Sequence, residues 1–154
     1  MIKQNVLGLV LLLTTNLAIS IDGLIAMKSD FSVVETADRL EKVLTANKLT
    51  VFNRIKHSDA ANKVGVALRP TELVIFGNPK VGSPLMACQQ SVAIDLPQKS
   101  LIWQDENGQV WIGYNDPMYL KSRHDIEACE PSLAKISKAL AAVTAKASKK
   151  AQSN

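Results

Sequence analysis

The feature that most constrains the fold of this chain is a predicted β-hairpin. Residues 99–104 and 109–114 contain β-branched and aromatic side chains, a composition typical of strands. They are joined by a short polar connection that ends in Asn107-Gly108. This pair is a strong signal for a hairpin turn. We therefore expect the two strands to pair in antiparallel fashion.

Three further strands and a set of helices are predicted around this hairpin. The strands are expected at residues 23–28, 49–55 and 71–76, and the last of these is expected to lie in the interior of the sheet. The segments with helical spacing or capping signals are residues 33–44, a short stretch after His57, residues 81–94 with a break near Cys88, and the regions that begin at Asp116-Pro117 and Glu130-Pro131. No internal repeat or long linker divides the chain. We predict a single-domain α+β fold, with a mostly antiparallel sheet and helices packed on one face.

Capping residues or apolar stripes support three of these helices in particular. Ser32 and Glu35 form a capping box before the first helix, whose apolar residues Val33, Ala37, Leu40 and Leu44 are spaced to lie on one core-facing side. Ser58 or Asp59 is expected to be the N-cap of the short helix. The last helix has apolar residues at i, i+3, i+7 and i+10, namely Leu133, Ile136, Leu140 and Val143. This spacing predicts one face that packs against the core.

Residues 1–20 are predicted to be a secretory signal peptide rather than part of the fold. One lysine precedes an apolar run over residues 6–13, and the small residues Ala18 and Ser20 precede the expected cleavage site. The run is shorter than the roughly 18 apolar residues that span a bilayer, and a retained anchor or an amphipathic helix is the alternative. We expect residues 21–154 to be periplasmic or secreted, with no stable membrane anchor.

The formal net charge of +4 does not indicate a nucleic-acid-binding protein. One lysine lies in residues 1–20 and three lie in residues 146–154, which contain no acidic residue. Without these four, 14 basic residues face 14 acidic ones, and they are scattered rather than grouped among stacking aromatics. We expect a neutral domain over residues 21–145, a disordered basic tail over residues 146–154, and no nucleic-acid partner.

The two cysteines, Cys88 and Cys129, are expected to form a structural disulfide if the chain is exported. Closing a loop of about 40 residues would stabilise the fold by about 4 kcal/mol in the chain-entropy model. A pair of free thiols or a metal site is the alternative. His57 and His124 have no His or Cys at a metal-ligand spacing. Each is predicted to be an isolated surface or turn histidine, and no metal or other cofactor is expected.

Residues 77–84, GNPKVGSP, form the most unusual stretch of the sequence. Its glycines are spaced as in a phosphate-binding loop, but the lysine is misplaced, and Ser83-Pro84 stands where that motif requires Lys-Ser/Thr. The stretch is expected to connect a buried strand to a helix N-terminus, where free backbone amides and Lys80 could hold an anion. A shaped turn without a ligand is the alternative.

The remaining polar candidates do not assemble into a catalytic group. Asp116, within residues 114–117, is predicted to be a helix N-cap, and Asp95 is predicted to be a capping or turn carboxylate. No G-x-S-x-G motif is present, and the Ser, His and Asp residues have no diagnostic spacing. The sequence therefore predicts no specific reaction.

In the order of its motifs, the chain resembles the domain of unknown function 302 family. The resemblance runs from about Asp22 to His124. It is carried by four ordered motifs: Thr50-Val51-Phe52 with Ile55 and His57, the segment 76–86, Ile94-Asp95-Leu96-Pro97 with Lys99, and Trp111 with Tyr114-Asn115-Asp116-Pro117.

The final helix also resembles that of exported members with this cysteine pair. The resemblance implies a compact α+β fold, is compatible with a homodimer, and supplies no reaction. It implies that six residues share one surface feature, either a ligand pocket or a dimer contact: Asn78, Lys80, Asp95, Lys99, Tyr114 and Asp116.

Three functions remain open for the sequence. The first is an exported binding or interaction module without catalysis, whose ligand is a small molecule or an anion. The second is an enzyme of unrecognised type that uses a pocket near Lys80, Asp95 and Tyr114, with His57 as a further candidate. The third is a structural homodimer formed through an exposed hydrophobic strand or helix.

Overall fold

The computed structural model describes residues 21–150, so the predicted signal peptide (residues 1–20) and residues 151–154 of the predicted tail lie outside the described residues. In chain order the elements are β1 (Leu24–Ser29), α1 (Val33–Ala46), β2 (Thr50–Lys56), α2 (His57–Lys63), β3 (Thr71–Gly77), α3 (Pro79–Cys88), η1 (Gln90–Ile94), β4 (Gln98–Gln104), β5 (Val110–Asn115), α4 (Pro117–His124), η2 (Glu127–Cys129) and α5 (Glu130–Ser148). The η elements are short 3₁₀ helices. The predicted break in the segment 81–94 is the junction of α3 and η1.

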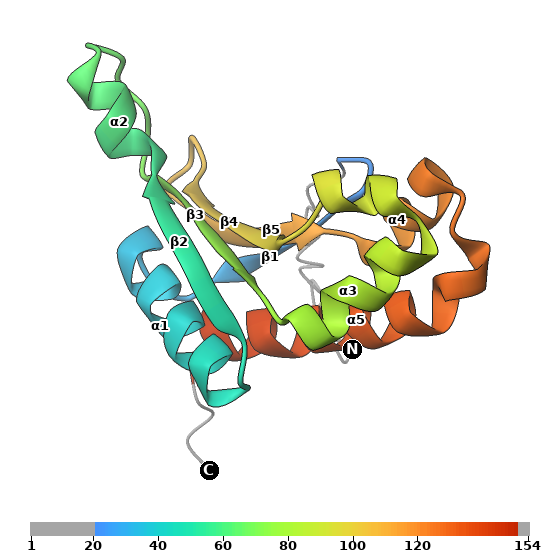
Figure 1. Cartoon of the computed structure of the whole chain (residues 1–154). Coiled ribbons are helices and arrows are strands. Elements are labelled where there is room, and N and C mark those ends of the chain that lie inside the picture. Colours follow the sequence, from blue (N-terminus) through green and yellow to red (C-terminus); the bar gives the residue numbers. More distant parts are fainter. Residues whose placement is uncertain (1–20, 151–154) are drawn as a thin grey trace, which may run out of the picture.

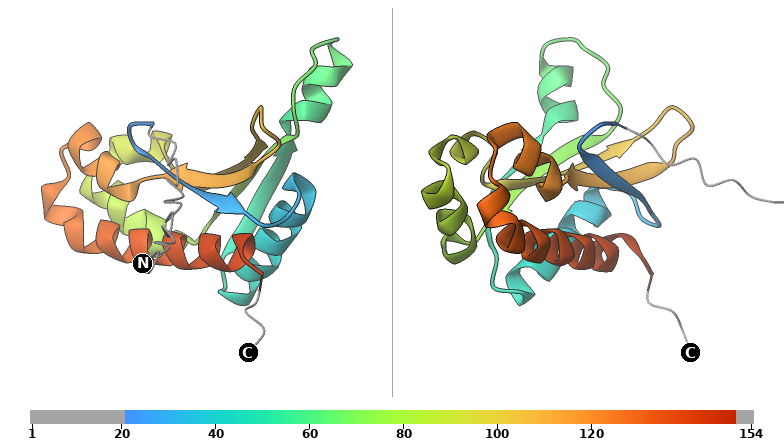
Figure 2. Two further views of the ribbon diagram at one scale, coloured as in Figure 1. Left: turned by 180° about the vertical axis from the view of Figure 1, so that it is seen from behind. Right: turned by 90° about the vertical axis from the view of Figure 1, so that its right-hand side faces the viewer.

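The five strands form one antiparallel sheet in the order β1-β5-β4-β3-β2. The predicted hairpin joins β4 to β5, where Ile102 lies opposite Ile112. The strand predicted to be interior, β3, lies between β4 and β2. Helices α1 and α5 cover the same face of the sheet, whereas α3 and α4 lie toward one end of it (Figure 1; Figure 2). The predicted α+β class, with helices on one face of a mostly antiparallel sheet, is confirmed.

The core lies between the sheet and the two covering helices. On β3, Val74 and Phe76 point into it, because alternate residues of a strand face opposite sides of the sheet. The apolar stripes predicted on both helices are buried there: Val33, Ala37, Leu40 and Leu44 of α1, and Leu133, Ile136, Leu140 and Val143 of α5. Each large apolar side chain stabilises the fold by about 1.5–3 kcal/mol through burial.

Two of the predicted helix caps are present. The Ser32 Oγ accepts a hydrogen bond from the Glu35 amide at 3.2 Å at the start of α1. The Asp116 carboxylate accepts one from the Met118 amide at 2.9 Å at the start of α4. Both bonds satisfy amides that have no partner within the first turn of a helix.

The predicted cap of α2 is wrong. The helix begins at His57, and Lys56 occupies the N-cap position without a side-chain hydrogen bond. Neither Ser58 nor Asp59 can cap it, because the chain passes directly from β2 into the helix and both residues lie inside the first turn. The Ser58 hydroxyl instead accepts a hydrogen bond from the Thr71 amide at 3.4 Å, which ties α2 to the start of β3.

The last helix continues to Ser148, three residues past the predicted end of the domain at residue 145. Arg39 of α1 holds its end, since the Arg39 Nε donates to the Ala147 carbonyl at 2.9 Å and the Nη2 donates to the Lys149 carbonyl at 3.0 Å. The same guanidinium lies 3.9 Å from the centroid of the Phe31 ring. Residues 146–148 therefore belong to the folded helix, because a side chain distant in sequence satisfies its terminal carbonyls.

The predicted disulfide is present and joins Cys88 to Cys129. It links the end of α3 to the residue before α5, across 41 positions of the sequence. The bond therefore connects the two helices that flank the cavity described next.

Candidate ligand-binding cavity

The turn between β3 and α3 is built around Asn78. Its Oδ1 accepts a hydrogen bond from the Lys80 amide at 2.9 Å. Its backbone carbonyl accepts from the amides of Val81 at 2.9 Å and Gly82 at 3.0 Å. These three amides at the start of α3 have partners within the chain, so the structure does not support the predicted anion site made of free backbone amides.

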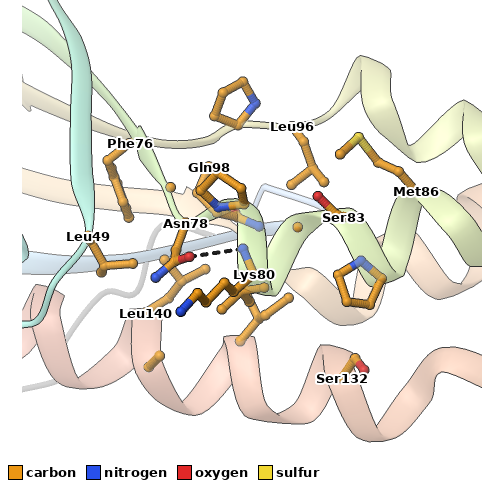
Figure 3. Close-up of a pocket in the computed structure, with 18 of the residues that line it drawn as sticks. Leu49, Phe76, Asn78, Lys80, Ser83, Met86, Leu96, Gln98, Ser132 and Leu140 are labelled. Carbon is orange, nitrogen blue, oxygen red and sulfur yellow. Dashed lines mark hydrogen bonds between the residues drawn. The ribbon is translucent and has the colours of Figure 1, made fainter.

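The same turn borders a cavity of about 530 Å³, a volume within the usual range for small-molecule sites. Its walls come from the start of β2, the end of β3, helix α3, the segment 93–98 and one side of α5 (Figure 3). Most of the lining is apolar, and its large members include Phe76, Val81, Met86, Leu96, Ile136 and Leu140. Such walls favour an alkyl or aromatic group.

The polar groups of the cavity are few, and two of them are cationic. Lys80 of α3 and Lys135 of α5 line the cavity and are exposed to solvent. Within residues 21–150, neither ammonium group forms an ion pair or a hydrogen bond. The Asn78 side chain is already engaged, because its Nδ2 donates to the Lys48 carbonyl at 3.3 Å. The cavity therefore combines apolar walls with two available positive charges.

Two other predicted residues, Asp95 and Lys99, belong to a different cluster. The Asp95 Oδ2 lies 2.6 Å from the His124 Nε2 and 3.3 Å from the Arg123 Nε. The Lys99 Nζ donates to the carbonyl oxygens of Asp95 at 2.8 Å and Pro97 at 2.7 Å. Burial lowers the pKa of the Lys99 ammonium, and the nearby Asp95 carboxylate partly opposes this effect. Lys99 thus holds the turn before β4.

The prediction of an isolated surface or turn histidine is wrong for His124. The residue is only 9% exposed, and its Nδ1 lies 2.9 Å from the Ser91 Oγ while its Nε2 contacts Asp95. The physical reason is that η1 and α4 pack against each other, so groups 33 and 29 residues apart in the chain meet. No spacing rule would have found this cluster. His57 is half-buried at the start of α2.

The last two predicted residues, Tyr114 and Asp116, serve the fold. Tyr114 is 3% exposed, and burial, together with the Asp116 carboxylate, raises the pKa of its hydroxyl. Asp116 caps α4 as predicted. Neither Asp95 nor Tyr114 lines the cavity that contains Lys80. Within residues 21–150, the six predicted residues therefore lie in three places. Asn78 and Lys80 line the cavity, Asp95 and Lys99 belong to the His124 cluster, and Tyr114 and Asp116 lie at the start of α4.

Two further findings concern residues 21–150 alone. No group of three or more His, Cys, Asp and Glu side chains is placed to hold a metal ion. No helix among them has the length and apolar character needed to cross a bilayer.

The order of strands and helices, with the Asn78 turn after β3, defines a small α+β domain of a recognisable family. The family model of the domain of unknown function DUF302 matches residues 25–143, so the chain belongs to this family. The fold is similar to the crystal structure of an uncharacterised conserved DUF302 protein from Bacillus stearothermophilus, with a TM-score of 0.76. That match is 23% identical in sequence and covers 82% of this chain and 99% of the other.

The chain is also similar to proteins of known name in Brucella. It is 40% identical over 104 residues to the fluoride-specific ion channel FluC 1 of Brucella suis and to the protein of that name in Brucella abortus. The matched region is 68% of this chain, but only 41% and 38% of the length of these relatives. The chain therefore spans about two fifths of the curated relatives it matches.

Proposed function

We propose that this domain is an exported binding module for a small amphiphilic anion, such as a medium-chain aliphatic carboxylate. The observation that carries the proposal is the cavity of about 530 Å³, whose apolar walls meet Lys80 and Lys135, two lysines that form no ion pair with any residue between 21 and 150. Export is supported by the signal-like pattern of residues 1–20 and by the Cys88–Cys129 disulfide, a bond typical of oxidising compartments.

The two parts of the cavity would contribute differently to binding. Burying an alkyl chain against the apolar wall stabilises the complex by about 0.8 kcal/mol per methylene group. The lysines are exposed, so each would add at most about 1 kcal/mol through its charge. Affinity is therefore expected to rise with chain length, whereas the lysines would set the preference for a carboxylate over a neutral head group.

Fluoride, the ion in the name of the Brucella relatives, does not fit this cavity. A small, strongly hydrated anion requires converging N–H donors to replace its water, and the first amides of α3 are already paired. We therefore include fluoride as a negative control rather than as a candidate ligand.

Calorimetric titration of residues 21–154 with decanoate, decan-1-ol, acetate and fluoride tests the proposal. Decanoate is expected to bind more tightly than decanol, and acetate and fluoride are expected not to bind. Ala139→Phe should fill the cavity and weaken decanoate binding more than tenfold, because Ala139 lines it. Ala141→Phe, on an exposed part of the same helix, is the matched control and should bind as the wild type does.

The lysines are tested separately with the double variant Lys80→Met and Lys135→Met, which keeps two long side chains but removes their charge. This variant should bind decanoate and decanol with similar affinity. Decanoate binding that is unchanged in Ala139→Phe, or acetate that binds as well as decanoate, would contradict the proposal.

A homodimer is the second candidate, supported by the face of the sheet opposite α1 and α5. This face carries four large apolar side chains that are half-buried, where polar side chains would be usual: Leu73, Ile75, Leu101 and Trp103. The solvent face of an antiparallel sheet is usually polar, so this face fits a second copy of the chain. Leu101→Glu should then shift the mass measured by light scattering from dimer to monomer. Val34→Glu, on the exposed side of α1, should leave it unchanged. A wild-type monomer would exclude this role.

A further inference from the structure

We propose that Ser91 is an activated nucleophile that accepts the acyl group of an activated carboxylic ester. The proposal rests on a chain of three side chains outside the cavity. The Ser91 Oγ lies 2.9 Å from the His124 Nδ1, and the His124 Nε2 lies 2.6 Å from the Asp95 Oδ2. A hydroxyl, an imidazole and a carboxylate in this order can activate a serine; here the serine faces the Nδ1 and the aspartate the Nε2, the reverse of the familiar triad.

The position of the imidazole proton follows from its two partners. The Asp95 carboxylate also contacts the Arg123 guanidinium at 3.3 Å, and an ionised carboxylate can only accept hydrogen bonds. The Nε2 of a neutral His124 must therefore carry the proton and donate it to Asp95. The Nδ1 then has a free lone pair and accepts the hydrogen bond from the Ser91 hydroxyl.

The cluster is both accessible and fixed in place. Ser91 is exposed, whereas His124 is only 9% exposed, so a reagent can approach the hydroxyl while the surrounding residues hold the imidazole. The Cys88–Cys129 disulfide lies three residues before Ser91 and five residues after His124, and it closes the same region of the fold. Held by packing and by a covalent bond, the two groups are preorganised for proton transfer.

The reaction assigned to Ser91 is transfer of an acyl group. The Oγ forms a bond to the carbonyl carbon of the ester while its proton passes to the His124 Nδ1. The bond between this carbon and the leaving oxygen then breaks, and the imidazolium returns the proton to the leaving alkoxide or phenolate. An acyl-serine and an alcohol are the products. Attack of water on the acyl-serine, assisted by the same imidazole, would release the carboxylic acid.

Labelling of residues 21–154 with a fluorophosphonate, followed by intact-mass measurement and peptide mapping, tests this proposal. The protein should gain one phosphonyl group at Ser91, with loss of fluoride, and should release p-nitrophenol from p-nitrophenyl acetate. Ser91→Ala should abolish labelling. His124→Gln should slow it about a hundredfold, in line with the usual contribution of a general base. Ser122→Ala removes an exposed hydroxyl on α4 that donates only to the Tyr119 carbonyl, and it should label as the wild type does.

Three results would overturn the proposal: labelling at a residue other than Ser91, an equal labelling rate in His124→Gln, or no label on the folded wild-type protein. If His124→Gln fails to fold, Asp95→Asn serves as the second variant, because it leaves the serine and the imidazole in place. It should slow labelling without removing it. Titration with decanoate reports independently on the cavity, so failure of either proposal is distinguished from failure of the other.

Discussion

Replacement of Arg39 by methionine is expected to destabilise the domain by about 2–3 kcal/mol. Methionine keeps much of the apolar stem of the side chain but removes every donor. Arg39 donates to carbonyls at the end of α5, at 2.9 Å to Ala147 and 3.3 Å to Lys146, and to the carbonyl of the C-cap residue Lys149 at 3.0 Å. Its guanidinium also packs over the Phe31 ring at 3.9 Å.

These contacts set the magnitude. A hydrogen bond from a charged donor contributes about 1.5–3 kcal/mol, and we assign the lower part of this range to the half-buried bond to Ala147. The two bonds made by the Nη2 are exposed to solvent and add little. The cation–π contact with Phe31 adds about 0.5–1 kcal/mol.

Urea unfolding of the disulfide-bonded protein, followed by circular dichroism, measures the effect. Hydrogen exchange of the amides of residues 145–148 reports on the end of α5 directly, and these amides should lose protection in Arg39→Met. The unfolding free energy of Arg39→Lys should lie between those of Arg39→Met and the wild type, because a single ammonium cannot reach three carbonyls as the planar guanidinium does. A loss below 0.5 kcal/mol in Arg39→Met would refute this account of the helix end.

Four further predictions concern other parts of the fold. The double variant Cys88→Ser and Cys129→Ser should lose up to about 4 kcal/mol of unfolding free energy, since the disulfide closes a loop with a sequence separation of 41; urea titration with and without reductant gives this value. The pKa of the Tyr114 hydroxyl is raised by burial, so the unfolded chain releases this proton first and stability should fall as the pH rises above about 10. Tyr114→Phe should flatten this alkaline fall in urea titrations from pH 8 to 11. Asp116→Ala should cost about 1 kcal/mol through loss of the α4 cap, seen as a lower melting temperature. Gly113→Ala should separate β1 from β5, because the added Cβ would lie 3.0 Å from a β1 carbonyl oxygen; faster hydrogen exchange in β1 would show this.

Elements defined by local periodicity could be predicted from the sequence. The apolar stripes of α1 and α5 and the hairpin at Asn107-Gly108 each depend on residues close together in the chain. Their positions in the structure agree with the predictions to within a few residues. The Asp116 cap was also predictable, since Pro117 follows it at the first turn of α4.

Features that depend on distant residues could not be predicted in this way. Arg39 is more than 100 residues from the carbonyls it binds, so nothing near residue 145 indicates that the helix continues. Ser91 and His124 meet only because η1 and α4 pack together. Lys80 was identified through its unusual loop, whereas Lys135 resembles any exposed lysine of an amphipathic helix until the cavity between α3 and α5 is seen.

The loop closed by the disulfide has a consequence for proteolysis. Residues 106–108, at the tip of the hairpin, are exposed, and they lie between Cys88 and Cys129. A protease that cuts the chain there produces two fragments that the disulfide still joins. The hydrogen bonds between neighbouring strands of the sheet are not affected by this cut. Such a nicked molecule would migrate as one species on a non-reducing gel and separate into two only after reduction. The two parts of the domain therefore remain covalently joined even when the backbone is cut at this exposed turn.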